Sequence, residues 1–223
     1  ALSAPLVRAQ APWPAKPVRI IAAGPAGGSA DIVARVLADV LSKQTGQTVI
    51  VEPKPGAGGV LAVNELSLAP RDGSTLLIGV SSLVSEIPHI VKLKTDMAAE
   101  IKPLVEVARG GLVMVGNPSL PAKTLPEVIS YVKANPGKVS FASYTAGTMS
   151  HVMGLQLNKA AGIDMLHVGY KGSTPALQDL MGGHVQLMFD GLATSIPLIK
   201  AGKIKAFAVS LPKRSPLLPD VPT

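Results

Sequence analysis

The 223-residue chain contains no cysteine, which excludes disulfide bonds, thiolate zinc sites and cysteine nucleophiles. Aromatic residues make up only 3% of it, so its core must be built from aliphatic side chains, and few rings are present on which bases or sugars could stack. Charged residues are also few, at 16% against 47% hydrophobic residues, which is typical of a compact globular protein. No uninterrupted apolar run approaches the roughly 18 residues of a membrane-spanning helix.

Acidic residues are scarcer than basic ones, and the formal net charge is +7. The lysines and arginines are nevertheless spread along the chain, without a run of four or more. A protein that binds nucleic acid more often gathers its positive charge on one stripe. We therefore expect a solvated cationic surface and no nucleic-acid partner.

The start of the chain, Ala1–Ala11, consists mostly of small and apolar residues. It ends in Ala9-Gln10-Ala11, the A-x-A form after which signal peptidase cuts. We interpret residues 1–11 as the remnant of a signal peptide. Export of the mature protein to the periplasm or to the outside of the cell is the expectation that follows.

From Val18 onward, short apolar runs alternate with amphipathic stretches, and Gly, Pro or Ser marks each boundary. Strands are expected at Val18–Ala23, Val49–Glu52, Thr75–Val80, Val139–Ala142, Met165–Val168, Val185–Phe189 and Ala206–Ser210, with Leu104–Val115 as two more pieces broken by Gly110-Gly111. Helices are expected at Ala30–Lys43, Gly58–Leu68, Leu125–Asn135, Thr148–Ala161 and Thr174–Met181, with a short one ending near Ala201-Gly202.

This alternation predicts an α/β protein, because strands separated by helices form parallel sheets with right-handed crossovers. The break at Asn117-Pro118 separates two such series. We expect two lobes, each a mainly parallel sheet flanked by helices, with residues 12–115 in the first lobe and residues 116–211 in the second.

Two loops rich in glycine and hydroxyl groups, Gly24–Asp31 and Ser143–Ser150, each follow a strand and open a helix. Glycine lets the backbone approach a ligand closely, and the free N–H groups at a helix start favour an anion such as phosphate or a carboxylate. Either loop alone is also explained by a Ser or Asp that caps a helix. As a pair, the loops are what two lobes need to hold one anion between them.

Three further polar residues follow strands and are candidates for the same site between the lobes. Ser81 and Ser82 come after the third strand and could donate from their hydroxyl groups. Asp190 comes directly after Val185–Phe189, where its carboxylate could orient a water or accept a hydrogen bond from a ligand.

Patterns for catalysis are weak in this sequence. It contains neither a G-x-S-x-G elbow nor H-E-x-x-H, and its histidines, at positions 89, 151, 167 and 184, lack metal-ligand spacing. Nucleotide-binding glycine motifs are absent too. We expect no catalytic residue, no metal ion and no cofactor, with a serine hydrolase that uses Ser143 and His151 as an alternative.

Several segments together resemble one family. In chain order they are Gly24–Arg35 (GPAGGSADIVAR), Thr48–Gly59 (TVIVEPKPGAGG), Asp72–Leu77, His167–Asp190 (HVGYKGSTPALQDLMGGHVQLMFD), Ala201–Ser210 and Leu218–Thr223. They are similar to the TctC-like extracytoplasmic solute receptors of tripartite tricarboxylate transporters, the Bug-type binding proteins. The resemblance runs from about Trp13 to the last residue.

The resemblance implies a two-lobed periplasmic binding protein of type II. Such a protein closes over a small organic acid, commonly a dicarboxylate, delivers it to membrane transporter subunits and has no enzyme activity. We expect a monomer. A periplasmic module that senses a carboxylate for a signalling partner would use the same clamp and is an alternative.

In the family, backbone N–H groups and hydroxyls of the two loops hold the ligand's carboxylate. The ligand-binding residues expected in this chain are Gly24, Pro25, Ala26, Gly27, Gly28, Ser29, Ser81, Ser82, Ser143, Ala146, Gly147, Thr148 and Asp190.

The chain departs from the family in two respects that matter for the pocket and the fold. Where the family usually has Pro-Phe after the first strand, this chain has Ala23-Gly24, so we expect a pocket without that aromatic wall, wider or more polar. Family members also continue well past Leu218–Thr223 and return to the first lobe to complete its sheet. Residues 212–223 would begin that return, and we expect the chain to be a fragment.

Overall fold

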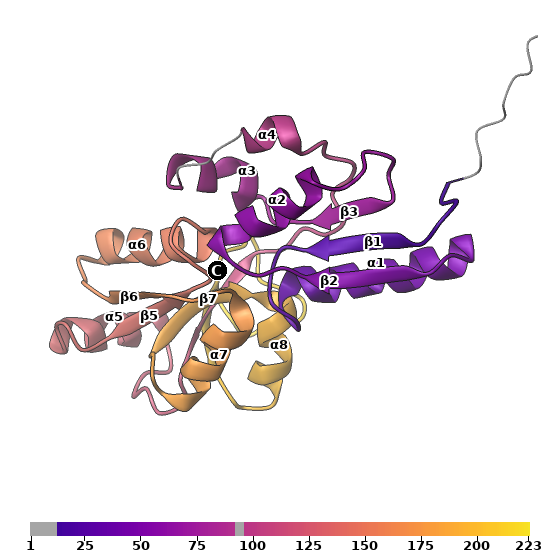
Figure 1. The fold of residues 1–223 in the computed structure, drawn as a ribbon. Helices are drawn as coiled ribbons and strands as arrows, with labels where there is room; N and C mark the ends of the chain where they lie inside the picture. Colours follow the sequence, from indigo (N-terminus) through magenta and orange to yellow (C-terminus); the bar gives the residue numbers. More distant parts are fainter. Residues whose placement is uncertain (1–12, 92–95) are drawn as a thin grey trace, which may run out of the picture.

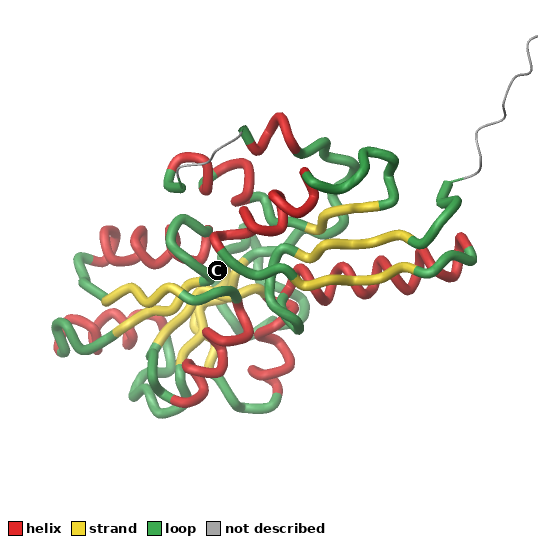
Figure 2. Tube along the Cα trace, in the orientation of Figure 1, coloured by secondary structure: helices red, strands yellow, loops and turns green. Residues whose placement is uncertain are grey.

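Two separate β-sheets organise the chain in the computed structural model, which describes residues 13–91 and 96–223 (Figure 1). The smaller sheet has the strand order β2-β1-β3, and the larger has the order β6-β5-β7-β4-β8. We call the described residues up to 111 lobe 1 and residues 112–223 lobe 2. In Figure 2 the two groups of strands lie side by side, each with helices against it.

Lobe 1 is a parallel sheet with helices on both faces. Its strands are β1 (Val18–Ala22), β2 (Val49–Pro53) and β3 (Thr75–Ile78), and both neighbours of β1 run parallel to it. Its helices are α1 (Ser29–Thr45), α2 (Val60–Ser67) with the 3₁₀ turn Ala57–Gly59 before it, α3 (Ser82–Ser85), the 3₁₀ turn Ile87–His89 and α4 (Met97–Glu100).

Helix α1 packs on one face of this sheet because its small residues recur at helical spacing. Ala30, Ala34 and Ala38 lie one turn apart and are buried against β1. The helix ends at Gly46, whose φ of +68° places it in the left-handed region that closes many helices. Val63 of α2 covers the opposite face.

Lobe 2 is a mixed but mainly parallel sheet. Strands β5 (Ser140–Ser143), β6 (Leu166–Gly169) and β7 (Leu187–Gly191) run parallel, and β4 (Leu112–Gly116) pairs antiparallel with both β7 and β8 (Lys205–Val209). The helices are α5 (Leu125–Ala134), α6 (Met149–Ala161), α7 (Ser173–Gly182) and α8 (Leu192–Lys200).

Alternation along β7 divides the core of lobe 2 into two layers. Leu187 and Phe189 point to the cluster that contains α5, and Met188 points to the cluster that contains α7. Successive strand residues face opposite sides of a sheet, so Asp190 shares the face of Met188. The chain thereby directs a carboxylate towards the starts of α7 and α8.

The predicted α/β organisation is confirmed at most elements, with ends that differ by a few residues. Three details were wrong. Residues 101–111 form no strand, Asp190 lies within β7 rather than after it, and β4 joins the larger sheet, so the change of sheet comes before Leu112. Leu104 and Val105 were expected in a strand, but no neighbouring strand pairs with them, and their side chains are about three-quarters exposed.

The last residues also differ from the expectation of a return to the first lobe. They pack on lobe 2, where the N–H of Val209 donates to the carbonyl of Pro222 and Leu218 is buried in the α7 cluster. Burial of these apolar side chains explains the placement. The expected signal-peptide remnant, residues 1–11, lies outside the described residues. Within the described ranges, no helix has the length and apolar character needed to cross a bilayer.

Gly154 allows α6 to pack against the core ring of Phe141, since a methyl group built on Gly154 would lie 2.0 Å from that ring. A Gly→Ala change within a helix ordinarily stabilises by up to about 1 kcal/mol. Here we expect Gly154→Ala to lower the free energy of unfolding by about 1 to 3 kcal/mol, because the core must move to accept the methyl group. Urea unfolding measures the change.

The matched control is Gly182→Ala in α7, where the added methyl group would meet only the exposed side chain of His184. We expect this variant to be close to wild type. Combining Gly154→Ala with Phe141→Leu should cost less than the two single changes added together. Strict additivity would show that the ring is not the obstacle.

Candidate functional site

The loop after β1 uses most of its own N–H groups internally. Gly27 N–H donates to Asp31 Oδ2 over 2.9 Å, and Gly28 N–H donates to the carbonyl of Pro25 over 3.0 Å. The first bond to helix α1 is from Ile32 N–H to the Gly28 carbonyl. The backbone N–H groups of the first turn, residues 29–31, therefore have no partner within the helix.

Two buried side-chain atoms in the described part of the chain lack a hydrogen-bond partner, and both lie in this first turn. They are Ser29 Oγ and Asp31 Oδ1. Ser29 Oγ faces lobe 2, because a methyl group built on Gly191 would lie 2.7 Å from it. Burying a hydroxyl group without a partner costs about 1 to 3 kcal/mol, so Ser29 is a site where a bound group would be favourable.

Asp31 is held as a charged group beside this hydroxyl. Burial opposes its charge, but the ion pair with Arg35 Nε at 2.9 Å and the bond from Gly27 N–H outweigh that effect and lower the pKa of Asp31. Arg35 is therefore paired with Asp31 and is not a free cation.

The hydroxyl groups of the second loop, at the end of β5, also contact groups of the protein itself. Ser143 Oγ lies 2.7 Å from His167 Nε2 and 3.1 Å from the carbonyl of Thr145. Thr148 Oγ1 donates to that same carbonyl over 2.8 Å, and Ala146 is exposed. The hydroxyl groups expected to bind a ligand thus shape the loop in this structure.

A histidine pair lies beneath this loop. The ring centroids of His151 and His167 are 3.9 Å apart, and Gly147 N–H donates to His151 Nδ1 over 3.1 Å. Burial lowers the pKa of both rings, and His151 lowers that of His167 further. The hydrolase alternative paired Ser143 with His151, whereas the structure pairs Ser143, which is fully buried, with His167.

Asp190 is fully buried and surrounded by hydroxyl groups. Its Oδ1 accepts from Tyr144 Oη at 2.9 Å and Ser173 Oγ at 2.6 Å, while Oδ2 accepts from Thr194 Oγ1 and Ser195 Oγ, each at 2.6 Å. Each oxygen thereby makes two hydrogen bonds, which is about its usual capacity. Burial, with help from the negative Asp190, raises the pKa of Tyr144, so its phenol stays a donor.

The remaining candidates lie at the start of α3. Ser82 is buried and Ser81 is exposed, with the carbonyl of Ser81 accepting from Ser85 Oγ. The same segment reaches lobe 2 further on, because a methyl group built on Gly147 would lie 2.7 Å from Ile90. The structure therefore brings the α3 segment to the second loop, and the first loop to Gly191.

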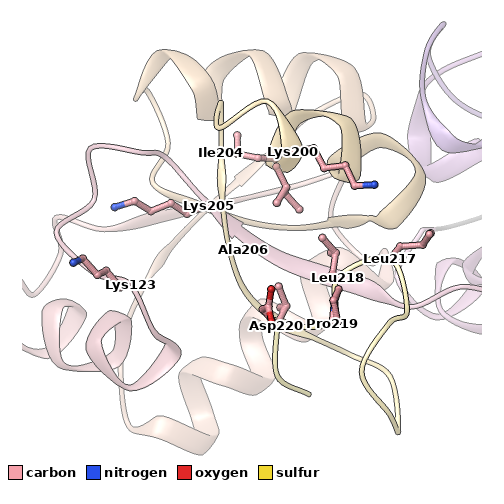
Figure 3. A pocket seen from close by; sticks show the side chains of 11 residues that line it. Lys123, Lys200, Ile204, Lys205, Ala206, Leu217, Leu218, Pro219 and Asp220 are labelled. Carbon is pink, nitrogen blue, oxygen red and sulfur yellow. The ribbon is translucent and has the colours of Figure 1, made fainter.

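Two surface cavities of the structure lie away from this junction between the lobes. The larger, of about 450 Å³, is lined in lobe 2 by α8, Lys123 and the last residues of the chain (Figure 3). Lys205 extends along it but donates to the carbonyls of Leu120 and Ala122, so its charge is already engaged. The second, of about 270 Å³, lies between α6 and β8. Neither includes the predicted loops.

Comparison with known proteins assigns the chain to a family. A family model described as the tripartite tricarboxylate transporter family receptor matches residues 33–223. The chain belongs to this receptor family. The resemblance seen in the sequence is thus confirmed.

Curated relatives match nearly all of the chain. The UPF0065 protein in the gbd 5' region of Cupriavidus necator is 38% identical over 211 residues, which are 95% of this chain and 64% of that protein. BugT of Bordetella pertussis is 36% identical over 215 residues, which are 95% of this chain and 65% of that protein. The chain spans just under two thirds of the length of these relatives.

Solved structures share the fold. One described as a periplasmic transporter has 39% identity and a TM-score of 0.85, covering 95% of this chain and 71% of its own. R. palustris Rpa4515 with adipate has 28% identity, a TM-score of 0.85 and the same coverage. MatC from Rhodopseudomonas palustris with bound malate has 29% identity and a TM-score of 0.83, covering 95% and 72%. The predicted two-lobed α/β binding-protein fold is confirmed.

Several residues at the junction between the lobes were not predicted from the sequence. Tyr144, His167, Ser173, Thr194 and Ser195 all contact the predicted candidates. A weak signal was available for three of them, because Ser173 begins a helix and Thr194 and Ser195 follow Asp190 by about one helical turn. Nothing local identified His167 as the ring that packs against His151.

The lowered pKa values of the histidine pair predict how the stability of this protein depends on pH. Unfolded histidine titrates near 6.5, above the folded values, so the unfolded chain binds more protons as the pH falls below about 6.5. The stability present above that pH is then lost on acidification. We expect urea unfolding at pH 7.5 and pH 5 to show this loss.

The variant His151→Asn keeps an acceptor for Gly147 N–H but does not titrate, so it should remove much of the loss at pH 5. The control is His89→Asn, at an exposed position. Equal pH dependence in wild type and His151→Asn would contradict this explanation.

The hydrogen bonds that Asp190 accepts predict that the substitution Asp190→Asn destabilises the protein. Asp190→Asn replaces an oxygen that accepts two hydrogen bonds with an amide that donates. We expect the free energy of unfolding to fall by about 1 to 3 kcal/mol, because buried hydroxyls lose their acceptor. Asp179→Asn, which affects one bond from Tyr170 Oη, should cost less, and the reverse order would refute the assigned contacts.

Proposed function

We propose that this chain is the binding part of a periplasmic solute receptor that captures a small organic acid between its two lobes. A receptor of this kind presents its ligand to the subunits of a tripartite tricarboxylate-type membrane transporter. Membership of the receptor family supports the proposal. So do the adipate and malate in two similar solved structures, since both ligands are dicarboxylates.

The observation that carries the proposal is the buried Ser29 Oγ, which has no partner and lies where the lobes meet. It stands at the start of α1, a helix of 17 residues, beside N–H groups that its own turn leaves unpaired. A carboxylate at this position would accept from the hydroxyl and from those N–H groups, and the helix dipole would favour its charge.

Neutral donors rather than a dedicated arginine then hold the ligand. Arg35 is paired with Asp31, and the positive net charge of +7 acts at a distance by steering anions towards the protein. Charge-assisted hydrogen bonds contribute roughly 1.5 to 3 kcal/mol each, so a few of them suffice for micromolar affinity.

The other expected ligand residues take supporting positions in this proposal. The loop Gly24–Gly28 and the loop Ser143–Thr148 form the two sides of the site, and Ser81 and Ser82 lie at its edge. Asp190 contributes by holding hydroxyl groups and helix starts in place, because its own oxygens are already bonded. The proposal includes no catalytic step, metal ion or cofactor.

Calorimetric titration against mono- and dicarboxylates, including malate and adipate, tests the function. We expect at least one acid to bind with micromolar affinity and to raise the melting temperature. The diamide of the same acid is the control, because it keeps the length but lacks the charge. Absence of heat and of a thermal shift with every acid would refute the proposal.

Ser29→Ala tests the site itself. We expect the affinity for the acid to fall about tenfold or more, which corresponds to one charge-assisted hydrogen bond. The ligand-free protein should keep or raise its melting temperature, because the lost hydroxyl had no partner. Ser130→Ala, at an exposed position on α5, is the matched control. Unchanged affinity in Ser29→Ala would place the carboxylate elsewhere.

A further inference from the structure

One of the places where the lobes meet lies between the first loop of lobe 1 and the start of α7 in lobe 2. There, Thr174 Oγ1 donates a hydrogen bond of 2.9 Å to the carbonyl of Ala26. Thr174 belongs to lobe 2, and Ala26 belongs to the loop that leads to Ser29. The bond can therefore form only while the first loop and the start of α7 are in contact.

Shape complementarity supports the same arrangement next to this bond. A methyl group built on Gly172 would lie 2.3 Å from Pro25 Cδ, so only a glycine leaves room for the proline ring. Gly172 also has a φ of +117°, which side-chain-bearing residues rarely adopt. The two backbones consequently approach each other closely, one from each lobe.

The start of α7 is held firmly, which places Thr174 for this contact. Gly172 N–H donates to the carbonyl of Tyr144 over 3.0 Å, and Ser173 Oγ is bonded to the buried Asp190. Thr174 follows directly in the same helical turn. Because its backbone is already ordered by lobe 2, forming the bond to Ala26 costs little additional conformational entropy.

We infer that Thr174 is a closure residue, whose hydroxyl group stabilises the closed arrangement of the lobes through its hydrogen bond to Ala26. In the ligand-free protein this bond raises the fraction of closed molecules. Where ligand binding is coupled to closure, a contact made only in the closed form also adds to the affinity and slows release. This second consequence rests on the proposed function, whereas the first does not.

The absence of cysteine makes closure measurable. Gln44→Cys on α1 and Lys159→Cys on α6 introduce two labelling sites at exposed positions, one in each lobe. Single-molecule energy transfer between two dyes then gives the ratio of closed to open molecules. The variant to compare is Thr174→Val, which keeps the shape but lacks the hydroxyl, and Thr174→Ser retains the hydroxyl as the matched control.

Without ligand, we expect Thr174→Val to reduce the ratio of closed to open molecules about two- to tenfold, the range for one net hydrogen bond. Thr174→Ser should stay near wild type, and similar melting temperatures would show that all three proteins fold alike. Identical energy-transfer distributions for Thr174→Val and wild type would overturn the inference.

With malate or adipate, stopped-flow measurement should show a dissociation rate for Thr174→Val that is raised by up to the same factor. A lowered closed fraction with unchanged dissociation would overturn the coupling of this contact to release. Failure of every acid to bind the wild type would count against the proposed function alone, because the ligand-free comparison would still decide whether Thr174 stabilises closure.

Discussion

The burial of one carboxylate, that of Asp190, organises the junction between the lobes. A charge removed from water is costly unless hydrogen bonds replace its hydration, and here four hydroxyl groups do so. These hydroxyls come from the loop after β5, the start of α7 and the first turns of α8. The carboxylate thus fixes the relative positions of three segments that face lobe 1.

Lobe 1 meets this ordered surface with a loop that is itself compact but incompletely bonded. Internal bonds give the loop its shape, while Ser29 Oγ and the N–H groups of the first turn of α1 are left without partners in the helix. A scaffold with satisfied polar groups on one side and unsatisfied donors on the other favours an anion between them. In the proposed binding site, neutral groups would suffice, since the preorganised donors need not be reordered on binding.

Much of the fold followed from local sequence. The apolar runs with breaks at Gly and Pro predicted most strands and helices, because alternation and helical spacing are properties of short segments. The predictions failed where pairing between strands determines whether a segment forms a strand and which sheet it joins. Leu104 and Val105 have the composition of a strand but no partner strand, and β4 changes sheets because it pairs with β7 and β8. Hydrogen-bond partners distant in the chain cannot be seen in a local pattern.

The sequence by itself determined the class of the protein, the two loops and their family, because residue type and order near helix starts carry that information. Only the tertiary structure decided what each polar group does. In the folded chain Ser143 lies within hydrogen-bond distance of His167, and the oxygens of Asp190 accept hydrogen bonds. Ser29 Oγ has no partner, and Thr174 donates to the carbonyl of Ala26. The physical reason is that a hydrogen bond depends on distance and direction in space, and these arise only when segments separated by many residues pack together.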